Sequence, residues 1–507
     1  MCGRSALAAD LGWQKWPDLR MANIAYASRR GTVMIARLFS AFLLLVLAAC
    51  AGQRMPATGA AGVAFVGANL LPMTGIERLP DQTVLIRSDH IEKIGPRRST
   101  RVPEGYRVID ATGLTLMPGL VDMHVHVANA PGNAGDAAAR ALNVMLAYGV
   151  TTARSLAGAP AHPALRARIE AGEIAAPRLY IAAPSINPDS AKDAAAVQAM
   201  VEAASRDGYD LLKVHGVASP QHWEVLRDAG ARKRLPVAGH IPDEVGLDQG
   251  LVLPFQAEHL DATIPALLPE NSSARHAVLG QVPPASVVEE AAKAGPDAVT
   301  ALAAKVARTG TFHTPTLSLF ERLLDDSVSA DALRAEPAMR YVPAAALDAW
   351  AQQHKQISAD PNTSGEAAVR FRNLRRAIVA AYHKAGVPMM AGSDSAQAFQ
   401  LWGDGLIREI ETLVAAGLPP LAALRSATVV PRDYLRSLPN GGSALGWKAD
   451  FGTVEEGARA DLILLGSDPS TNVAALRDLR GVMATGRWFD RPALDSLLEQ
   501  VAKAANP

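Results

Sequence analysis

The first residues whose types and spacing suggest chemistry are His124 and His126, which end an apolar stretch that starts at Leu116. If this stretch is a β-strand, alternate side chains point the same way, so both imidazoles lie on one face at the carboxyl end of the strand. Two imidazoles at this spacing can bind a single metal ion. An isolated pair of this kind is more often two half-buried strand histidines, so the rest of the chain must decide.

Other strand-like runs also carry, at or near their ends, residues of the types that commonly bind metals or contact substrates. The further candidate metal ligands are Lys213, His240, His259 and Asp394. Four histidines and an aspartate at separate strand ends suit a borderline-soft divalent metal. His215 and His313 lie at strand ends as well and are predicted to contact substrate, although a structural role for His313 is an equal alternative. Asp122 is predicted to orient a ligand imidazole.

Apolar strands that alternate with alanine-rich helical segments are expected to position these residues. The predicted strands cover residues 116–126, 150–154, 178–183, 211–215, 236–240, 257–260, 312–317 and 387–394. This α/β pattern predicts a closed (β/α)8 TIM barrel, in which active sites lie at the carboxyl ends of the strands. The residues between Leu319 and Phe371 are an insertion that could form a lid or a substrate wall at the barrel mouth.

Short strands at both ends of the chain, at 63–111 and 452–486, predict a small β-sandwich domain built from both ends. The predicted domain boundaries are 1–49 for a signal peptide with an upstream extension, 50–62 for a tether, 63–117 for the first sandwich part, 118–444 for the barrel, 445–492 for the second sandwich part and 493–507 for a C-terminal tail.

The composition excludes some classes of protein. The 507 residues are 49% hydrophobic and 20% charged, as in an ordinary globular protein. The formal net charge is zero and no long basic run occurs, so no nucleic-acid partner is expected. Cys2 and Cys50 are the two cysteines, so no disulfide can form once the leader is removed.

The leader has a positive region that includes Arg37, followed by the apolar run 38–49 and then Cys50. This run is too short to span a bilayer and ends in small residues, as a secretory signal does. Leu47-Ala-Ala-Cys50 resembles a bacterial lipobox, which implies a lipid anchor on Cys50 and a protein that faces the periplasm. The alternative is a plain signal peptide, and Met34 is the expected start.

Several motifs together resemble the amidohydrolase superfamily. They are Pro118-Gly-Leu-Val-Asp-Met-His-Val-His126, the Gly-His and Glu-His strand ends, Gly392-Ser-Asp394 and Gly457-Ala-Arg-Ala-Asp461. Gly239-His-Ile-Pro242 is similar to the imidazolonepropionase-like and Xaa-Pro-dipeptidase-like members. The resemblance covers roughly residues 63 to 490. It implies the barrel, the β-sandwich and one or two divalent metals, with zinc expected first and manganese, cobalt or iron as alternatives.

The resemblance also implies roles for individual residues. His124 and His126 would bind the more buried metal, His240 and His259 the second, and Asp394 would be a shared ligand and the proton acceptor. Lys213 would be N-carboxylated and bridge the metals. The alternatives are an ion-paired Lys213, which favours one metal, and Asp394 as a helix N-cap.

The expected function is metal-dependent hydrolysis of an amide-like C–N bond in a small peptide-like or N-acyl amino acid substrate. Metal-activated hydroxide would attack, with Asp394 as general base and acid. The alternatives are a lactone or phosphotriester hydrolase, an imidazolonepropionase-like cyclic amide hydrolase and a non-catalytic binding lipoprotein. The sequence leaves the oligomeric state open.

Overall fold

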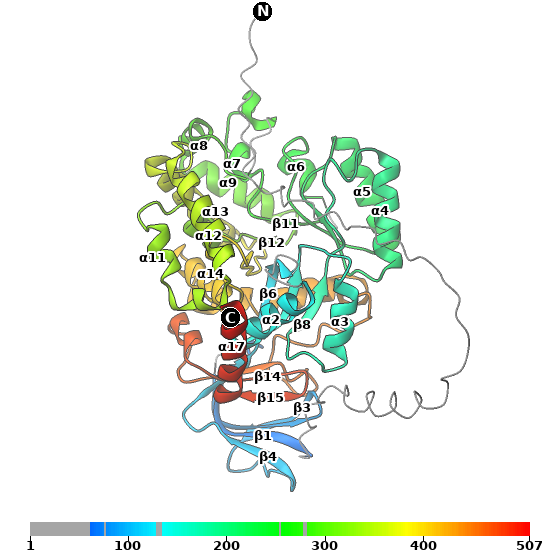
Figure 1. Cartoon of the computed structure of the whole chain (residues 1–507), viewed down its shortest axis with the longest axis vertical. Coiled ribbons are helices and arrows are strands. Elements are labelled where there is room, and N and C mark those ends of the chain that lie inside the picture. Colours follow the sequence, from blue (N-terminus) through cyan, green and yellow to red (C-terminus); the bar gives the residue numbers. More distant parts are fainter. Residues whose placement is uncertain (1–60, 76–77, 128–133, 253–254, 277–280, 507) are drawn as a thin grey trace, which may run out of the picture. The chain divides into compact units, whose positions relative to one another are not determined.

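An eight-stranded sheet is formed by two segments that lie far apart in the chain (Figure 1). The first segment contributes β1 (Gly62–Leu70), β2 (Leu79–Arg87), β3 (His90–Pro96), β4 (Tyr106–Asp110) and β5 (Thr115–Pro118). The second contributes β13 (Leu462–Leu465), β14 (Leu479–Ala484) and β15 (Arg487–Asp490). The strand order is β15-β14-β13-β5-β1-β2-β3, with β4 beside β1, and β5 joins β13 antiparallel. The expected domain built from both chain ends is therefore present.

The structure is a computed structural model and describes residues 61–75, 78–127, 134–252, 255–276 and 281–506. These residues all belong to the unit Thr58–Pro507. The predicted signal peptide, the lipidation site Cys50 and almost all of the tether lie outside the described residues. Within the described ranges, no helix combines the length and the apolar character that crossing a bilayer requires.

The predicted strand from Leu116 to His126 is two strands, β5 and β6 (Leu120–Val125), which is a correction to the sequence-based prediction. Pro118 has no N–H to donate, and the N–H of Gly119 bonds to the carbonyl oxygen of Asp461 at 2.8 Å. A Cβ atom on Gly119 would lie 2.3 Å from the side chain of Thr151, so the chain passes too close for another residue. The break lets β5 end in the sheet while β6 enters the barrel.

The barrel is built from parallel strands in two hydrogen-bonded groups. One group is β6, β7 (Val150–Ser155) and β8 (Arg178–Ile181), and the other is β9 (Leu212–Val214), β10 (Val237–Gly239), β11 (Phe255–Glu258) and β12 (His313–Thr314). The bridge between Ala182 and Leu211 joins the two groups on one side. The confirmed fold is thus a TIM barrel with a second, smaller domain.

The eighth predicted strand, residues 387–394, closes the ring without forming a regular strand. Single bridges join Met389 to β12 and Ser395 to Val125 of β6. Between them, Asp394 donates its N–H to the carbonyl oxygen of His124 at 2.7 Å. Pro388 lacks an N–H and Asp394 has a φ of 54°, so the pleat of a strand cannot continue through this segment.

Helices surround the strands on the outer side. Those up to the insertion are α2 (Ala134–Ala147), α3 (His162–Glu170), α4 (Ala194–Arg206), α5 (Pro220–Lys233), α6 (Gly246–Gly250), α7 (Thr263–Ala266), η2 (Ser273–His276), α8 (Ala285–Ala292) and α9 (Gly295–Ala307). The insertion also folds into helices: α10 (Leu317–Leu323), α11 (Ala330–Arg334), η3 (Pro337–Tyr341), α12 (Ala344–Ala359) and the start of α13 (Gly365–Ala385). The chain ends with α14 (Asp404–Ala415), α15 (Pro420–Ser426), α16 (Val429–Ser437), η4 (Pro439–Gly442), η5 (Val473–Arg477) and α17 (Arg491–Ala505).

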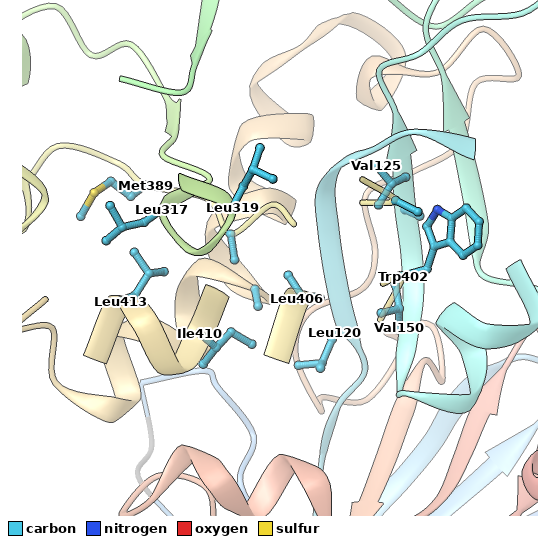
Figure 2. Packing of buried hydrophobic residues seen from close by; sticks show 14 of the residues in the cluster. Leu120, Val125, Val150, Leu317, Leu319, Met389, Trp402, Leu406, Ile410 and Leu413 are labelled. Carbon is cyan, nitrogen blue, oxygen red and sulfur yellow. The ribbon is translucent and has the colours of Figure 1, made fainter. Parts of the chain in front are cut away.

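Helix α14 shows how the helical layer holds the strand ends in place. Leu406, Ile410 and Leu413 recur on one face of this helix, at the spacing of an α-helix, and all are fully buried. Figure 2 shows this face toward Leu317 and Leu319 of α10 and Leu120 of β6. Burial of each such side chain contributes about 1.5–3 kcal/mol.

The segment 493–507, expected to be a tail, lies largely within helix α17. Leu494, Leu498 and Val501 form a buried face, and α17 packs against α2. The side chain of Asp490 caps the helix by accepting a hydrogen bond from the N–H of Ala493. The end of the chain therefore packs against the helical layer of the barrel.

Candidate metal centre

Three ligand-type atoms from β6 and from the eighth segment converge at one point. Nε2 of His124 lies 3.2 Å from Nε2 of His126, and Oδ1 of Asp394 lies 3.3 Å and 3.0 Å from these two nitrogens. An ion about 2.1 Å from each of two ligands, at an angle between about 90° and 110°, separates them by about 3.0–3.4 Å. The spacing of the three atoms fits one shared divalent ion.

The hydrogen bonds around these atoms also fit a shared divalent ion. Nδ1 of His124 lies 2.8 Å from Oε2 of Glu258, and when it donates to this carboxylate its Nε2 carries a lone pair. Oδ1 of Asp394 is buried and accepts no hydrogen bond within the described part of the chain. A lone pair and an ionised carboxylate oxygen at 3.3 Å repel each other unless a proton or a metal ion lies between them. The donor set therefore fits a metal ion.

His240 and His259, at the ends of β10 and β11, lie on the other side of Asp394. The ring of His259 is 4.7 Å from that of His124 and 4.5 Å from that of His240. Its Nδ1 lies 3.6 Å from Oδ2 of Asp394. The structure thus brings the four predicted histidine ligands and Asp394 into one buried cluster, with Asp394 facing histidines on both sides.

In each of these two histidines, Nδ1 lies within hydrogen-bond distance of an oxygen outside the cluster of predicted ligands. Nδ1 of His240 lies 2.7 Å from Oδ2 of Asp261, and Nδ1 of His259 lies 2.8 Å from the hydroxyl oxygen of Thr316. Like the contact of Glu258 with His124, the one with Asp261 leaves Nε2 of His240 as the nitrogen available to a metal. Asp261 and Glu258 were not among the predicted site residues.

Asp122 does not orient an imidazole, which corrects the prediction for this residue. Its carboxylate accepts hydrogen bonds from the hydroxyl and the N–H of Ser393, at 2.6 and 3.0 Å, and from the N–H of His124 at 3.2 Å. It holds the backbone before Asp394 against β6, while Glu258 contacts the imidazole.

Sequence reasoning missed Glu258 because adjacent residues of a regular strand point to opposite faces. His259 has a φ of 59° and so leaves the strand conformation directly after Glu258. The side chains of Glu258 and His259 can then both contact the cluster, Glu258 at His124 and His259 at Asp394. The available signal was the close grouping of acidic residues around His259, in Ala257-Glu-His-Leu-Asp261.

Burial controls the protonation of the cluster. It lowers the pKa of His126 to about 3 and holds the pKa of His124, His240 and His259 well below its usual value. The imidazoles are therefore neutral, which is the form that binds metal. Burial also raises the pKa of Asp394 to about 7. It raises the pKa of Glu258 to about 8, against the opposing effect of Arg154.

Lys213 lies in β9 with a side chain that is fully buried. Its Nζ has no hydrogen-bond partner within the described residues. Both oxygens of the nearby Glu258 are already used, one by His124 and the other by Arg154 at 2.8 Å. Burial lowers the pKa of the Lys213 amine. An ammonium group without a partner is costly at such a position, so the neutral amine is favoured.

The two predicted substrate contacts have different positions. His215 stacks on His240 with ring centres 5.0 Å apart, and both line a pocket with His259, Asp261, Phe371 and Arg375. His313 is not brought to the cluster: its buried ring lies 5.2 Å from that of Tyr382 in α13. Thr314, the next residue, bonds to Gln256 of β11 instead, so the strand alternation turns His313 toward the helices.

Residues 115–489, well over half of the chain, match the Amidohydrolase family. The chain belongs to the amidohydrolase family. This membership confirms the predicted superfamily and supports the predicted enzyme class, a metal-dependent hydrolase of carbon–nitrogen bonds.

Individual relatives of this amidohydrolase are distant or match over a short segment. A dihydroorotase from Geobacter metallireducens is 37% identical over 62 residues, which span 12% of this chain and 13% of that protein. A putative prolidase from Bifidobacterium longum has a TM-score of 0.59 and 21% identity, over 87% of this chain and 98% of its own. The bottromycin amidohydrolase has a TM-score of 0.65 and 22% identity, over 88% and 91%. At these identities the two structures show a shared fold.

Proposed function

We propose that the protein hydrolyses an amide-like C–N bond in a small peptide-like or N-acyl amino acid substrate, using divalent metal held by His124, His126, His240, His259 and Asp394. The observation that carries the proposal is the group of three ligand atoms at mutual distances of 3.0–3.3 Å, at the carboxyl end of β6. The resemblance of the fold to a putative prolidase and to the bottromycin amidohydrolase supports hydrolysis of an amide-like bond, and the prolidase supports a peptide-like substrate.

Two metals are favoured over one by the environment of Lys213. Burial favours the neutral amine of Lys213, which can add to carbon dioxide and release a proton to give an anionic carbamate. Such a carbamate could bridge a metal at His124 and His126 to a metal at His240 and His259. An ion-paired lysine with one metal is the alternative, and Nζ has no polar partner among the described residues, which argues against it.

Asp394 is proposed to move the proton in the reaction. When bound, the metal would acidify the attacking water and polarise the substrate carbonyl. Asp394 can accept the proton of this water and later deliver it to the leaving nitrogen, because its carboxyl lies between the two pairs of histidines and has a pKa of about 7 before metal binds. His215 in the adjoining pocket is positioned to donate a hydrogen bond to the carbonyl oxygen.

Assays of the chelator-treated protein test this function. Zinc or manganese is added back, bound metal is counted, and turnover is measured on dipeptides, N-acyl amino acids, a cyclic amide, lactones and phosphotriesters, with Asp394→Asn as the inactive control. Metal-dependent turnover of the first two classes is expected, with two metals per chain. One tight metal per chain with turnover of the cyclic substrate would favour an imidazolonepropionase-like activity. Absence of turnover on every substrate would refute catalysis and favour a binding protein.

We also propose that the protein is a lipoprotein anchored through Cys50 and facing the periplasm. Leu47-Ala-Ala-Cys50 after a short apolar run motivates this proposal. Replacement of Cys50 by alanine should move the protein from the membrane fraction to the soluble fraction. A wild-type protein that is soluble and carries no lipid by mass spectrometry would refute it.

A further inference from the structure

Beneath the proposed metal ligands, a buried arginine connects three strands of the barrel. Arg154 of β7 is 2% exposed. Its Nε donates to the carbonyl oxygen of Met123 in β6 at 2.8 Å, and its Nη2 donates to Oε1 of Gln256 at 2.6 Å and to Oε1 of Glu258 at 2.8 Å, both in β11. The second carboxylate oxygen of Glu258 faces Nδ1 of His124 at 2.8 Å.

We propose that Arg154 and Glu258 form a positioning pair that sets the metal affinity of His124. The inference rests on the proposed function, since it requires that His124 binds metal. Glu258 fixes the proton on Nδ1 and so directs Nε2 to the ion. Arg154 holds the carboxylate through one oxygen and the peptide carbonyl just before His124 through its Nε. Arg154 thus orients the backbone next to His124 directly and its imidazole through Glu258.

A purely structural role is the alternative, because buried ion pairs also occur far from active sites. The contacts of Glu258 argue for positioning. Two N–H groups, one from each of Arg154 and His124, contact separate oxygens of Glu258, so the carboxylate links the arginine directly to the imidazole. A comparable buried pair away from the cluster provides the structural control: Nη1 of Arg166 lies 2.7 Å from Oδ2 of Asp210, with both side chains at most 5% exposed. The Asp210 carboxylate contacts no proposed metal ligand in the described structure.

The decisive variant is Glu258→Gln, which keeps the shape of the side chain and removes its charge. Metal affinity is measured by competition with a chelator of known zinc affinity, so the readout does not depend on turnover. The dissociation constant is expected to rise by about 10–100-fold. Asp210→Asn is the matched control: it should lower the unfolding temperature of the metal-free protein but leave the zinc dissociation constant within about twofold of wild type.

The double variant Arg154→Met/Glu258→Gln removes both buried charges together and serves if the single variant does not fold. It should regain stability relative to Arg154→Met alone, because no unpaired charge remains, yet retain weak zinc binding. Wild-type zinc affinity in Glu258→Gln, or in the folded double variant, would overturn the positioning role. A wild-type protein that binds no zinc would instead overturn the proposed function together with the inference built on it.

Discussion

Replacement of Lys213 by methionine should change stability in opposite directions with and without metal. In the metal-free protein, Lys213 is a fully buried amine whose Nζ has no partner among the described residues. Leaving a buried polar group unsatisfied costs about 1–3 kcal/mol, and more for a charged group. Methionine fills nearly the same volume without a polar nitrogen, so the metal-free variant should be more stable by about 1–2 kcal/mol, after a small loss for the missing atom.

With metal present the order should reverse. If a carbamate on Lys213 bridges two ions, the variant loses a ligand of both and binds one ion weakly or not at all. At a free metal concentration about a hundred times the dissociation constant, each bound ion contributes about 2.7 kcal/mol to the free energy of unfolding. The wild type should then be the more stable protein, and the variant should lose most of its turnover.

Thermal unfolding of both proteins, with chelator and with zinc, tests this reversal, together with metal counting. In a domain of about 150–250 residues, 1 kcal/mol shifts the unfolding temperature by about 2–4 °C, and in this longer chain the shift should be smaller. Lys293→Met is the control, since Lys293 has a side chain that is 62% exposed and pairs with Glu290 at the surface. A Lys213→Met protein that is less stable without metal, and that binds as much zinc as wild type, would refute the bridging role and assign Lys213 a structural one.

Three further predictions concern Asp394, the protons at the site and Gly392. Asp394→Asn should lower kcat by about 10²–10⁴-fold at saturating zinc, and a loss below tenfold in steady-state assays would exclude it as the proton carrier. Because burial raises the pKa of Asp394 from 3.8 to about 7, its proton must leave when metal binds. Zinc affinity should therefore rise by up to about tenfold per pH unit below pH 7 and level off above it, and a flat profile in chelator competition between pH 5.5 and 7 would contradict this. Gly392→Ala should weaken zinc binding and destabilise the fold, because its Cβ would lie 2.4 Å from Cγ2 of Thr314 and 2.8 Å from Cβ of His124. Unchanged zinc affinity and an unchanged unfolding temperature would show that β6 and β12 can move away from residue 392 at no cost.

The sequence predicted the fold and the grouping of the imidazoles because both depend on simple periodicity. Strands ending in His124, His240 and His259 must open onto one face once they form a parallel barrel. What it missed depends on local backbone. The positive φ of His259 lets Glu258 contact the cluster, and the strand alternation that directs Thr314 toward Gln256 leaves His313 facing helix α13. Arg154 gave no signal, since a single arginine in an apolar strand has no periodic or motif context.

Arg154, Glu258 and Asp261, which the sequence did not reveal, matter because their ionisable side chains affect the charge balance around the proposed metal site. Burial makes every ionised group there costly, so that without metal the imidazoles stay neutral and the pKa of Asp394 and Asp261 is raised to about 7. Arg154 lies 2.8 Å from Glu258 and opposes the effect of burial on the pKa of this carboxyl, although burial still raises that pKa to about 8. The oxygen of Asp394 that faces the histidines has no such partner. A metal ion where His124, His126 and Asp394 meet would supply a positive charge to this oxygen and would favour the ionised form of Asp394.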